Sequence, residues 1–133
     1  MQNNIFVKNT TDMGRGVFAR LPILEGHIIE ECPCISVPYD ITSACQHTVL
    51  RFYVFRGGPS EDILALGYGS LYNHAPEGVA NAVYTYDGAN NVITFTALRN
   101  IEEGEQVLIN YGYNPLVELE KWKTRKAKDD MER

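Results

Sequence analysis

The sequence has few cysteines, no long apolar run and no low-complexity tract. The three cysteines, Cys32, Cys34 and Cys45, are odd in number, and their spacing does not fit the paired ligands of a zinc site. We therefore expect no metal, and interpret the cysteines as small buried side chains in a reducing compartment. No stretch approaches the ~20 apolar residues of a membrane helix. The amino terminus lacks a signal-peptide pattern, which predicts an intracellular protein with no membrane partner.

The motifs of the common hydrolases and metalloenzymes are also missing. There is no serine or cysteine in a nucleophile elbow, and no paired-histidine metal motif. Residues 14–19 formally match the dinucleotide fingerprint G-x-G-x-x-A, but no βαβ unit surrounds them and the chain is short for a doubly wound sheet. A tight turn, whose glycines let the backbone pass close to a ligand or another strand, is the simpler interpretation.

The composition is that of one globular domain over residues 1–133. Hydrophobic residues make up 44% and charged residues 22%, which is ordinary for such a domain, and the length suffices for its own core. The net charge of −5 disfavours direct nucleic-acid binding and suits a basic partner, such as a lysine-rich tail. Basic residues near the carboxyl end alternate with acidic ones and are interpreted as a solvated helix face.

The hydrophobic pattern predicts a β-rich fold with one helix. We expect short strands at 5–8, 17–19, 28–37, 82–86, 92–97 and 107–111. Pro33 and Pro38 should confine the third of these to an edge or an irregular course. The segment 49–55 fits either a strand or a short buried helix. An N-cap followed by proline predicts a helix over 115–122, and the charged tail from Lys123 should fray or be disordered.

Two polar runs interrupt apolar, strand-like sequence: Leu-Tyr-Asn-His at 71–74 and Asn-Tyr-Gly at 110–112. A buried Asn-His pair is costly unless every polar atom is hydrogen-bonded, so two such runs close to a core indicate a binding site. A single histidine in apolar surroundings is more often a satisfied core residue than a catalyst. The chain also has eight tyrosines, whose rings attract a cationic alkylamine and whose hydroxyls orient its nitrogen.

In order and spacing, these motifs resemble the SET-domain protein lysine methyltransferases, and among them the small stand-alone members from bacteria and large DNA viruses. The resemblance spans about residues 5–113 and rests on 14–19, on Tyr72-Asn73-His74 with Asn81 downstream, on 101–105, and on Asn110-Tyr111-Gly112. It implies a β-rich α+β fold (a β-clip) of small curved sheets. The two late motifs would meet there in a knot-like crossing, with a carboxyl-terminal helix and charged tail at 114–133.

The resemblance also implies S-adenosylmethionine as cofactor and a lysine of a protein or peptide as substrate, possible examples being histone-like basic tails. By the same resemblance Tyr111, with Tyr53, would be catalytic, and Glu105 matches a motif glutamate that is more structural than catalytic. The implied cofactor-binding residues are Arg15, Gly16, Asn73, His74 and Tyr111. The implied channel residues are Tyr53, Tyr84, Ile109, Tyr113 and Trp122.

The chain departs from the family pattern at several positions. Ile109 stands where Phe or Tyr often controls the number of methyl groups added, and we expect Tyr84 to fill that space instead. The family often has Asp where this chain has Asn110, and residues 75–80 replace a shorter spacer before Asn81. No cysteine follows position 45, so a zinc segment that closes the channel in many members is missing, and the 115–122 helix is expected to close it through Trp122.

Other functions fit part of this pattern. The main alternative is a non-catalytic SET-like module that binds a peptide or a protein. A methyltransferase acting on a small amine or on a non-histone protein is a further possibility, because surface loops set substrate choice. The family resemblance places the protein in the cytoplasm if it is bacterial, and in the host nucleus if it is viral. Exposed apolar residues of the 115–122 helix would also suit a homodimer.

Overall fold

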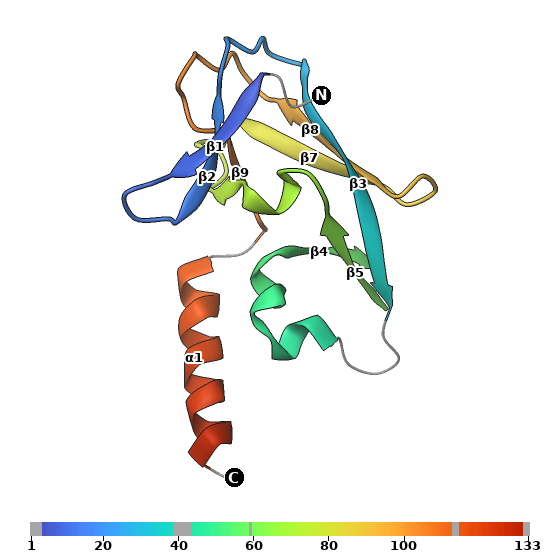
Figure 1. The fold of residues 1–133 in the computed structure, drawn as a ribbon, viewed down its shortest axis with the longest axis vertical. Coiled ribbons are helices and arrows are strands. Elements are labelled where there is room, and N and C mark those ends of the chain that lie inside the picture. The colour runs from blue at the N-terminus through green and yellow to red at the C-terminus, as the bar shows by residue number, and fades with distance from the viewer. Residues whose placement is uncertain (1–3, 39–43, 59, 113–114, 132–133) are drawn as a thin grey trace.

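The computed structural model describes residues 4–38, 44–58, 60–112 and 115–131, and Figure 1 shows their arrangement. The strands are β1 (Ile5–Asn9), β2 (Arg15–Ala19), β3 (Ile28–Pro38), β4 (Val54–Gly58), β5 (Glu61–Ala65), β6 (Asn73–His74), β7 (Ala82–Asp87), β8 (Val92–Ala97) and β9 (Leu108–Ile109). Three short 3-10 turns, η1 (Ala44–His47), η2 (Val49–Phe52) and η3 (Gly69–Leu71), and one helix, α1 (Pro115–Met131), complete the described elements. No helix among them is long and apolar enough to cross a membrane.

The first sheet is the antiparallel hairpin β1–β2, which pairs Ile5 with Ala19 and Asn9 with Arg15. Its turn is closed by Thr10, whose main-chain N–H donates to the carbonyl oxygen of Gly14 at 2.7 Å. Gly14 has a φ of +68°, a conformation that glycine adopts without strain. The hairpin expected around the glycine pair is therefore present, and its turn leads directly into β2.

The second sheet has five strands in the order β4-β5-β3-β8-β7, and β3 runs through its centre. The first part of β3, up to Pro33, pairs with β8, whereas the part from Cys34 onward pairs with β5. Each part of β3 therefore has a partner along one edge, which suits a strand that contains two prolines without N–H groups. The irregular course expected for this strand also shows as a bulge between Ile28 and Glu30.

The third sheet joins the two polar runs. β6 and β9 pair in parallel, with Asn73 opposite Leu108 and His74 opposite Ile109. The N–H of Ala75 donates to the Ile109 carbonyl at 2.9 Å and extends the ladder by one bond. The expected meeting of the two late motifs is confirmed, and it brings the segment before Tyr111 beside Asn73 and His74.

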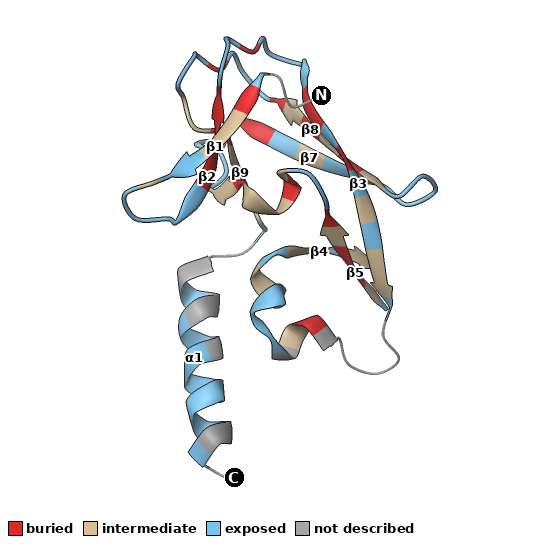
Figure 2. Ribbon diagram, viewed as in Figure 1, coloured by how far each residue is buried: buried red, intermediate tan, exposed pale blue. Residues whose placement is uncertain are grey.

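The hydrophobic core lies between these sheets, where Figure 2 shows the buried residues concentrated. Its largest fully buried apolar side chains include Tyr72, Phe95, Ile63, Ile93 and Ile101. The buried polar residues are Glu30, Asp62 and Asn81. Buried polar side chains are costly unless hydrogen-bonded, so their partners identify positions where the fold is built around specific bonds.

α1 extends well beyond the expected helix, and the expectation that the tail from Lys123 frays is wrong over the described residues. The helix continues to Met131, and it projects from the sheets in Figure 1. Every side chain of α1 whose burial is described is exposed. Lysine, arginine, glutamate and alanine all have high helix propensity, so a charged sequence of this kind can remain helical while fully solvated.

The segment 49–55 contains both a turn and the start of a strand. η2 is capped by Thr48, whose hydroxyl accepts a 3.2 Å hydrogen bond from the Leu50 N–H, and none of its residues is buried. The alternative of a buried helix is therefore wrong, and β4 begins at Val54. No local pattern predicted β5, because it opens with two carboxylates, yet the second of them, Asp62, is only 3% exposed.

Candidate active site

The β6–β9 crossing is fastened by the side chain of Asn81, which is 1% exposed. Its Oδ1 accepts from the Leu108 N–H at 2.8 Å, and its Nδ2 donates to the Gln106 carbonyl at 2.8 Å and to the Glu105 carboxylate at 3.1 Å. All the capacity of the amide nitrogen is therefore used, which offsets the cost of burying it. Asn81 fixes the segment that leads into β9 and so places Tyr111.

Glu105 has a structural role in this crossing. Its carboxylate accepts from the Glu102 N–H at 3.0 Å and pairs with Arg99 at 3.0 Å, in addition to its bond with Asn81. Burial alone would raise the pKa of Glu105, but the hydrogen bonds from Glu102, Asn81 and Arg99 together lower it. An ionised carboxylate with these donors holds the turn before β9.

The turn that contains Gly14 and leads to Gly16 (the glycine turn) contacts the first polar run through the side chain of Asn73. Its Nδ2 donates to the Arg15 carbonyl at 3.1 Å and to Gln106 Oε1 at 2.9 Å. A Cβ on Gly16 would lie 2.4 Å from that Gln106 oxygen and 2.9 Å from Asn73 Nδ2, so only glycine fits there. Within the described part of the chain Asn73 Oδ1 accepts no hydrogen bond, and it is left available to a ligand.

His74 holds the main chain of the second polar run. Its Nδ1 accepts a 3.0 Å hydrogen bond from the N–H of Tyr111, and the two rings lie 5.0 Å apart between centroids. Burial lowers the pKa of His74, so the neutral imidazole needed to accept this bond is favoured. The side chain of His74 is thus used in positioning Tyr111.

The hydroxyl of Tyr111 donates to the main-chain carbonyl of Tyr72 at 2.5 Å. Tyr111 lies on the wall of a cavity of about 420 Å³, which the η2–β4 segment also lines. The cavity is lined by Gln46, Arg51, Phe52, Tyr53, Val54, Phe55, Arg56, Asp62, Gly69, Ser70, Tyr72, Tyr84 and Tyr111. Six of these thirteen residues are aromatic, and the wall also contains two arginines and one buried carboxylate.

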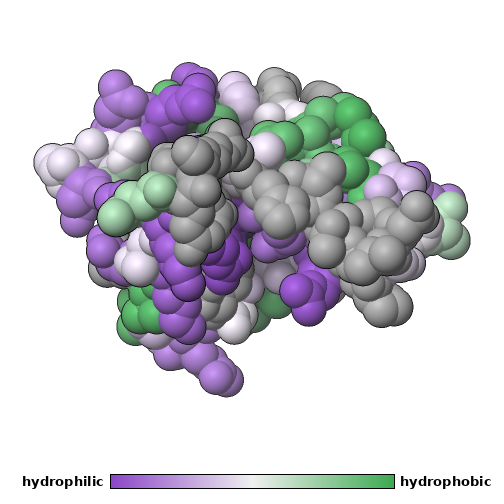
Figure 3. Space-filling model, turned by 90° about the horizontal axis from the view of Figure 1, so that it is seen from below, coloured by the Kyte–Doolittle hydropathy of each residue, from purple (hydrophilic) through white to green (hydrophobic). Residues whose placement is uncertain are grey.

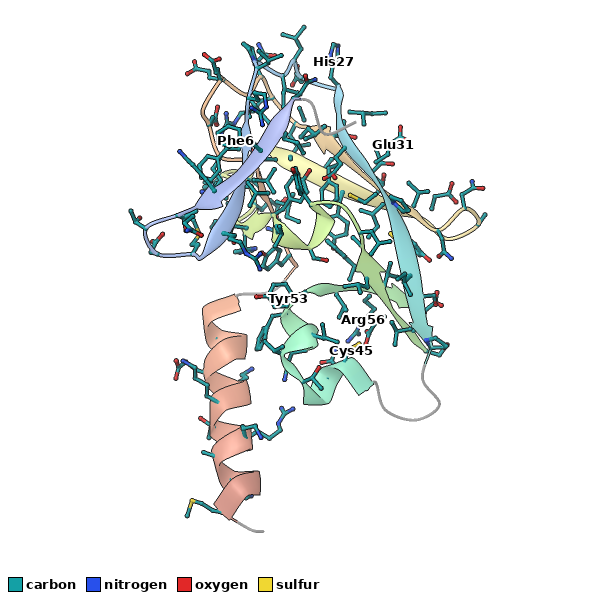
Figure 4. All side chains as sticks on the ribbon, viewed as in Figure 1. Phe6, His27, Glu31, Cys45, Tyr53 and Arg56 are labelled. Atoms are coloured by element: carbon teal, nitrogen blue, oxygen red, sulfur yellow. The ribbon has the colours of Figure 1, made fainter. Side chains whose placement is uncertain are left out.

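Three of the tyrosines expected from the sequence, Tyr53, Tyr84 and Tyr111, share this wall although they come from three separate elements. Tyr53 follows η2 and Arg56 lies on β4, and Figure 4 shows both near the middle of the view, above Cys45. The face seen from below in Figure 3 has hydrophobic patches beside strongly hydrophilic ones. A ligand with an apolar stem and a charged end matches this mixture.

Other residues singled out from the sequence lie elsewhere. Ile109 is fully buried in the core and is not among the residues that line the cavity. Tyr113 and the side chain of Trp122 fall outside the described residues, so the expected closure through Trp122 is not described either. Among the described residues no group of three or more His, Cys, Asp or Glu could hold a metal ion.

Sequence reasoning missed Gln106, whose Oε1 joins the Asn73 amide at the glycine turn. It also missed Arg56 and Asp62 on the cavity wall. In the sequence, Gln106 is only a polar residue next to the motif glutamate Glu105, and such a pair of polar residues is common on protein surfaces. Only the pairing of β6 with β9 shows that it faces Asn73 and Gly16.

Known proteins share this arrangement. Residues 14–112 match the family described as the SET domain. A histone-lysine N-methyltransferase, H3 lysine-37 specific, from Schizosaccharomyces pombe is 35% identical over 107 residues, which cover 80% of this chain and 71% of the yeast protein. The crystal structure of a candidate histone methyltransferase from Plasmodium falciparum aligns with a TM-score of 0.65 and 31% identity, over 87% of this chain and 99% of that one.

Proposed function

The chain belongs to the SET-domain family, and from this premise we propose that it is a protein-lysine N-methyltransferase that uses S-adenosylmethionine. The observation that carries the proposal is the Tyr111 hydroxyl, which is fixed on the Tyr72 carbonyl at the aromatic cavity. The proposed cofactor turn bonds Asn73, and the neighbouring His74 accepts from the Tyr111 N–H. The proposed lysine cavity has Tyr111 on its wall. A site of this kind needs no metal for methyl transfer.

The residues around Asn73 fit the amino-acid end of the cofactor. Asn73 Oδ1 is a free acceptor among the described contacts and suits an ammonium group, because the other end of its amide is held by Arg15 and Gln106. Because Gly16 has no side chain, Gln106 and Asn73 pack directly against the backbone of the turn. We assign cofactor contacts to Arg15, Gly16, Asn73 and His74. When bound, S-adenosylmethionine supplies a methyl group on a positively charged sulfur that an amine can displace.

The cavity wall would prepare the lysine amine for attack. Only the neutral amine has a lone pair, and aromatic walls disfavour the ammonium by removing water from it. The same wall carries the guanidinium groups of Arg51 and Arg56 and the buried carboxylate of Asp62. We therefore assign the channel to this cavity, with Tyr53 and Tyr84 on its sides.

The Tyr111 hydroxyl would set the direction of the amine. Because it donates its one proton to the Tyr72 carbonyl, it can only accept from a group in the cavity. An amine N–H that donates to this oxygen would leave the amine lone pair directed away from Tyr111 and free to attack the methyl group that the bound cofactor would supply. Holding the two reactants in line can contribute up to ~7–11 kcal/mol of the barrier.

The substrate we propose is a lysine in a basic, histone-like tail. The net charge of −5 favours association with a positively charged segment. The yeast relative carries histone-lysine methyltransferase in its name, and the similarity covers most of both chains. A histone substrate would place the activity in the nucleus, or in a host nucleus for a viral protein.

The proposal is tested by two measurements on the full chain. Isothermal titration with S-adenosylmethionine should give saturable one-to-one binding, and radiolabelled methyl transfer should mark lysines of purified histones or of proteins in a lysate. Binding without any transfer to either source would support the non-catalytic module instead. Absence of cofactor binding would refute the enzymatic function.

A further inference from the structure

One buried carboxylate has no role in the proposed methyl transfer. It is hydrogen-bonded to Tyr72, and the Tyr72 carbonyl holds the hydroxyl of the proposed catalytic residue, Tyr111. Glu30, on β3, is 1% exposed. Its Oε1 accepts from the Tyr72 hydroxyl at 2.8 Å, and its Oε2 accepts from the Tyr68 N–H at 3.0 Å. The Cys32 thiol on the same strand also hydrogen-bonds to it. Each of these groups can donate to a carboxylate oxygen.

These two bonds fasten both ends of one short turn. Tyr68 is the N-cap residue of η3 and Tyr72 its C-cap residue, and η3 leads directly into β6. No side chain within the turn caps its first residue. The first residue of η3, Gly69, packs closely on its neighbours, because a Cβ there would lie 2.5 Å from Ala65 Cβ and 3.0 Å from the Cys32 sulfur. Glu30 therefore holds a segment that has little regular structure of its own.

Two parts of Tyr72 have different contacts: its side chain is anchored in the core, and its main-chain carbonyl contacts Tyr111. Its ring stacks on Phe95 with centroids 4.0 Å apart and planes 17° apart, and its hydroxyl ends on Glu30. Its carbonyl accepts the Tyr111 hydroxyl. Because β6 is only two residues long, ladder bonds fix this carbonyl weakly. The side-chain anchor determines where the carbonyl oxygen lies.

We propose that Glu30 is a positioning residue for methyl transfer, acting through the hydroxyl, ring and carbonyl of Tyr72 to fix the hydroxyl of Tyr111. The inference rests on the proposed function for its catalytic consequence. Burial and the negative charge of Glu30 both raise the pKa of Tyr72, so that phenol keeps its proton and remains a donor to the carboxylate. The hydrogen bonds described for Glu30 go to Tyr72 and Tyr68, and neither residue is among the proposed cofactor contacts.

Three variants separate this role from general stability. Tyr72→Phe removes the hydroxyl and leaves the ring stack and the main-chain carbonyl. Glu30→Gln keeps the shape and removes the charge. Tyr86→Phe is the matched control, because the Tyr86 hydroxyl bonds Asn91 in the exposed β7–β8 hairpin, away from the cavity.

The first measurement does not need activity. In protein labelled with carbon-13 at the tyrosine Cζ, the Tyr111 signal reports its hydroxyl bond, and its assignment comes from Tyr111→Phe. We expect this signal to move in Tyr72→Phe and in Glu30→Gln, and to stay in Tyr86→Phe. An unmoved Tyr111 signal in folded Tyr72→Phe overturns the proposal, whether or not the protein transfers methyl groups.

The second measurement is steady-state methyl transfer. Misplacing a reacting group by a fraction of an ångström to 1 Å can cost up to ~100-fold in rate, and we expect kcat to fall at least ~10-fold in Tyr72→Phe with KM for the peptide within about twofold. In the Tyr111→Phe background the same change should have no further effect. Equal losses in both backgrounds, or a loss confined to KM, would overturn the positioning role. A moved Tyr111 signal with unchanged kcat would do the same.

Discussion

The imidazole of His74 accepts a hydrogen bond from the main-chain N–H of Tyr111, 37 positions along the chain. It joins β6 to the residue that follows β9 through a side chain that can take up a proton near neutral pH. Protonated imidazole has no free lone pair at Nδ1, so protonation must break this bond. The bond therefore makes the crossing sensitive to acid.

The stability of the protein should fall as the pH drops below the ordinary histidine value of about 6.5. Burial lowers the pKa of His74 in the folded state, so the unfolded state binds its proton first. The contribution of His74 is complete above the unfolded pKa and is lost as pH falls through the folded one. Melting temperatures at about pH 7.5 and about pH 5.5 measure it.

His74→Asn is the informative variant for this pH dependence. The Oδ1 of the asparagine can still accept from the Tyr111 N–H, and the asparagine side chain does not titrate. Its melting temperature should change less between the two pH values than that of the unaltered protein. His27→Asn serves as the control, since His27 is exposed. Identical pH profiles for the unaltered protein and His74→Asn would show that His74 has no such role.

Removal of the Tyr111 hydroxyl should abolish most of the activity with little effect on folding. Tyr111→Phe loses the bond to the Tyr72 carbonyl, which contributes about 1 kcal/mol to stability, and loses the acceptor for the amine. We expect kcat to fall by roughly 10²–10³. Methyl transfer and thermal melting, measured on the same preparation, decide this, and near-normal turnover would place the chemistry elsewhere.

Tyr84 should limit how many methyl groups are added. It stands on the cavity wall, its ring meets Phe55 edge-on at 4.7 Å, and its hydroxyl has no hydrogen-bond partner among the described residues. Tyr84→Phe would open space near the amine, and the product should shift towards higher methylation. Mass spectrometry of the product peptide reads this out, and an unchanged distribution would reject the idea.

Gly16→Ala should weaken cofactor binding. The new Cβ would push apart Gln106 Oε1 and Asn73 Nδ2, which are bonded to each other. Overpacking of this kind typically costs 1–3 kcal/mol, roughly. Gly88→Ala is the control, because its Cβ would meet only the Tyr86 ring at an ordinary 3.5 Å. Titration with S-adenosylmethionine should show weaker binding in Gly16→Ala alone, and equal affinities would exclude this turn from the cofactor site.

Much of the fold was predictable from local pattern. The hairpin at β1–β2 and the pair β7–β8 follow from alternating residues around glycine- and asparagine-rich turns, and the structure has both. The meeting of Asn73-His74 with the segment before Tyr111 came from the family resemblance, since no local signal predicts a parallel pair of two residues. The predicted helix ended too early, because the highly charged sequence from Lys123 onward was interpreted as frayed or disordered, whereas α1 continues to Met131.

The burial of Glu30 could not be predicted. It stands beside Glu31, and strict alternation would place Ile29 on the opposite face from Glu30. The bulge between Ile28 and Glu30 breaks that alternation, and both Ile29 and Glu30 are buried. The donors that satisfy the carboxylate come from Tyr68 and Tyr72, about forty positions later, so only the tertiary structure brings them together.

The parallel pairing of β6 with β9 also has a consequence for the order of assembly. The register places Asn73 opposite Leu108, so this pair cannot form within a local hairpin. The β1–β2, β4–β5 and β7–β8 hairpins can form from contacts between neighbouring segments, whereas the β3–β8 pairing and the alignment of Tyr111 on Tyr72 wait for distant segments to dock. Because β6 and β9 are only two residues long, a local opening of this pair would inactivate the enzyme while most of the domain stayed folded.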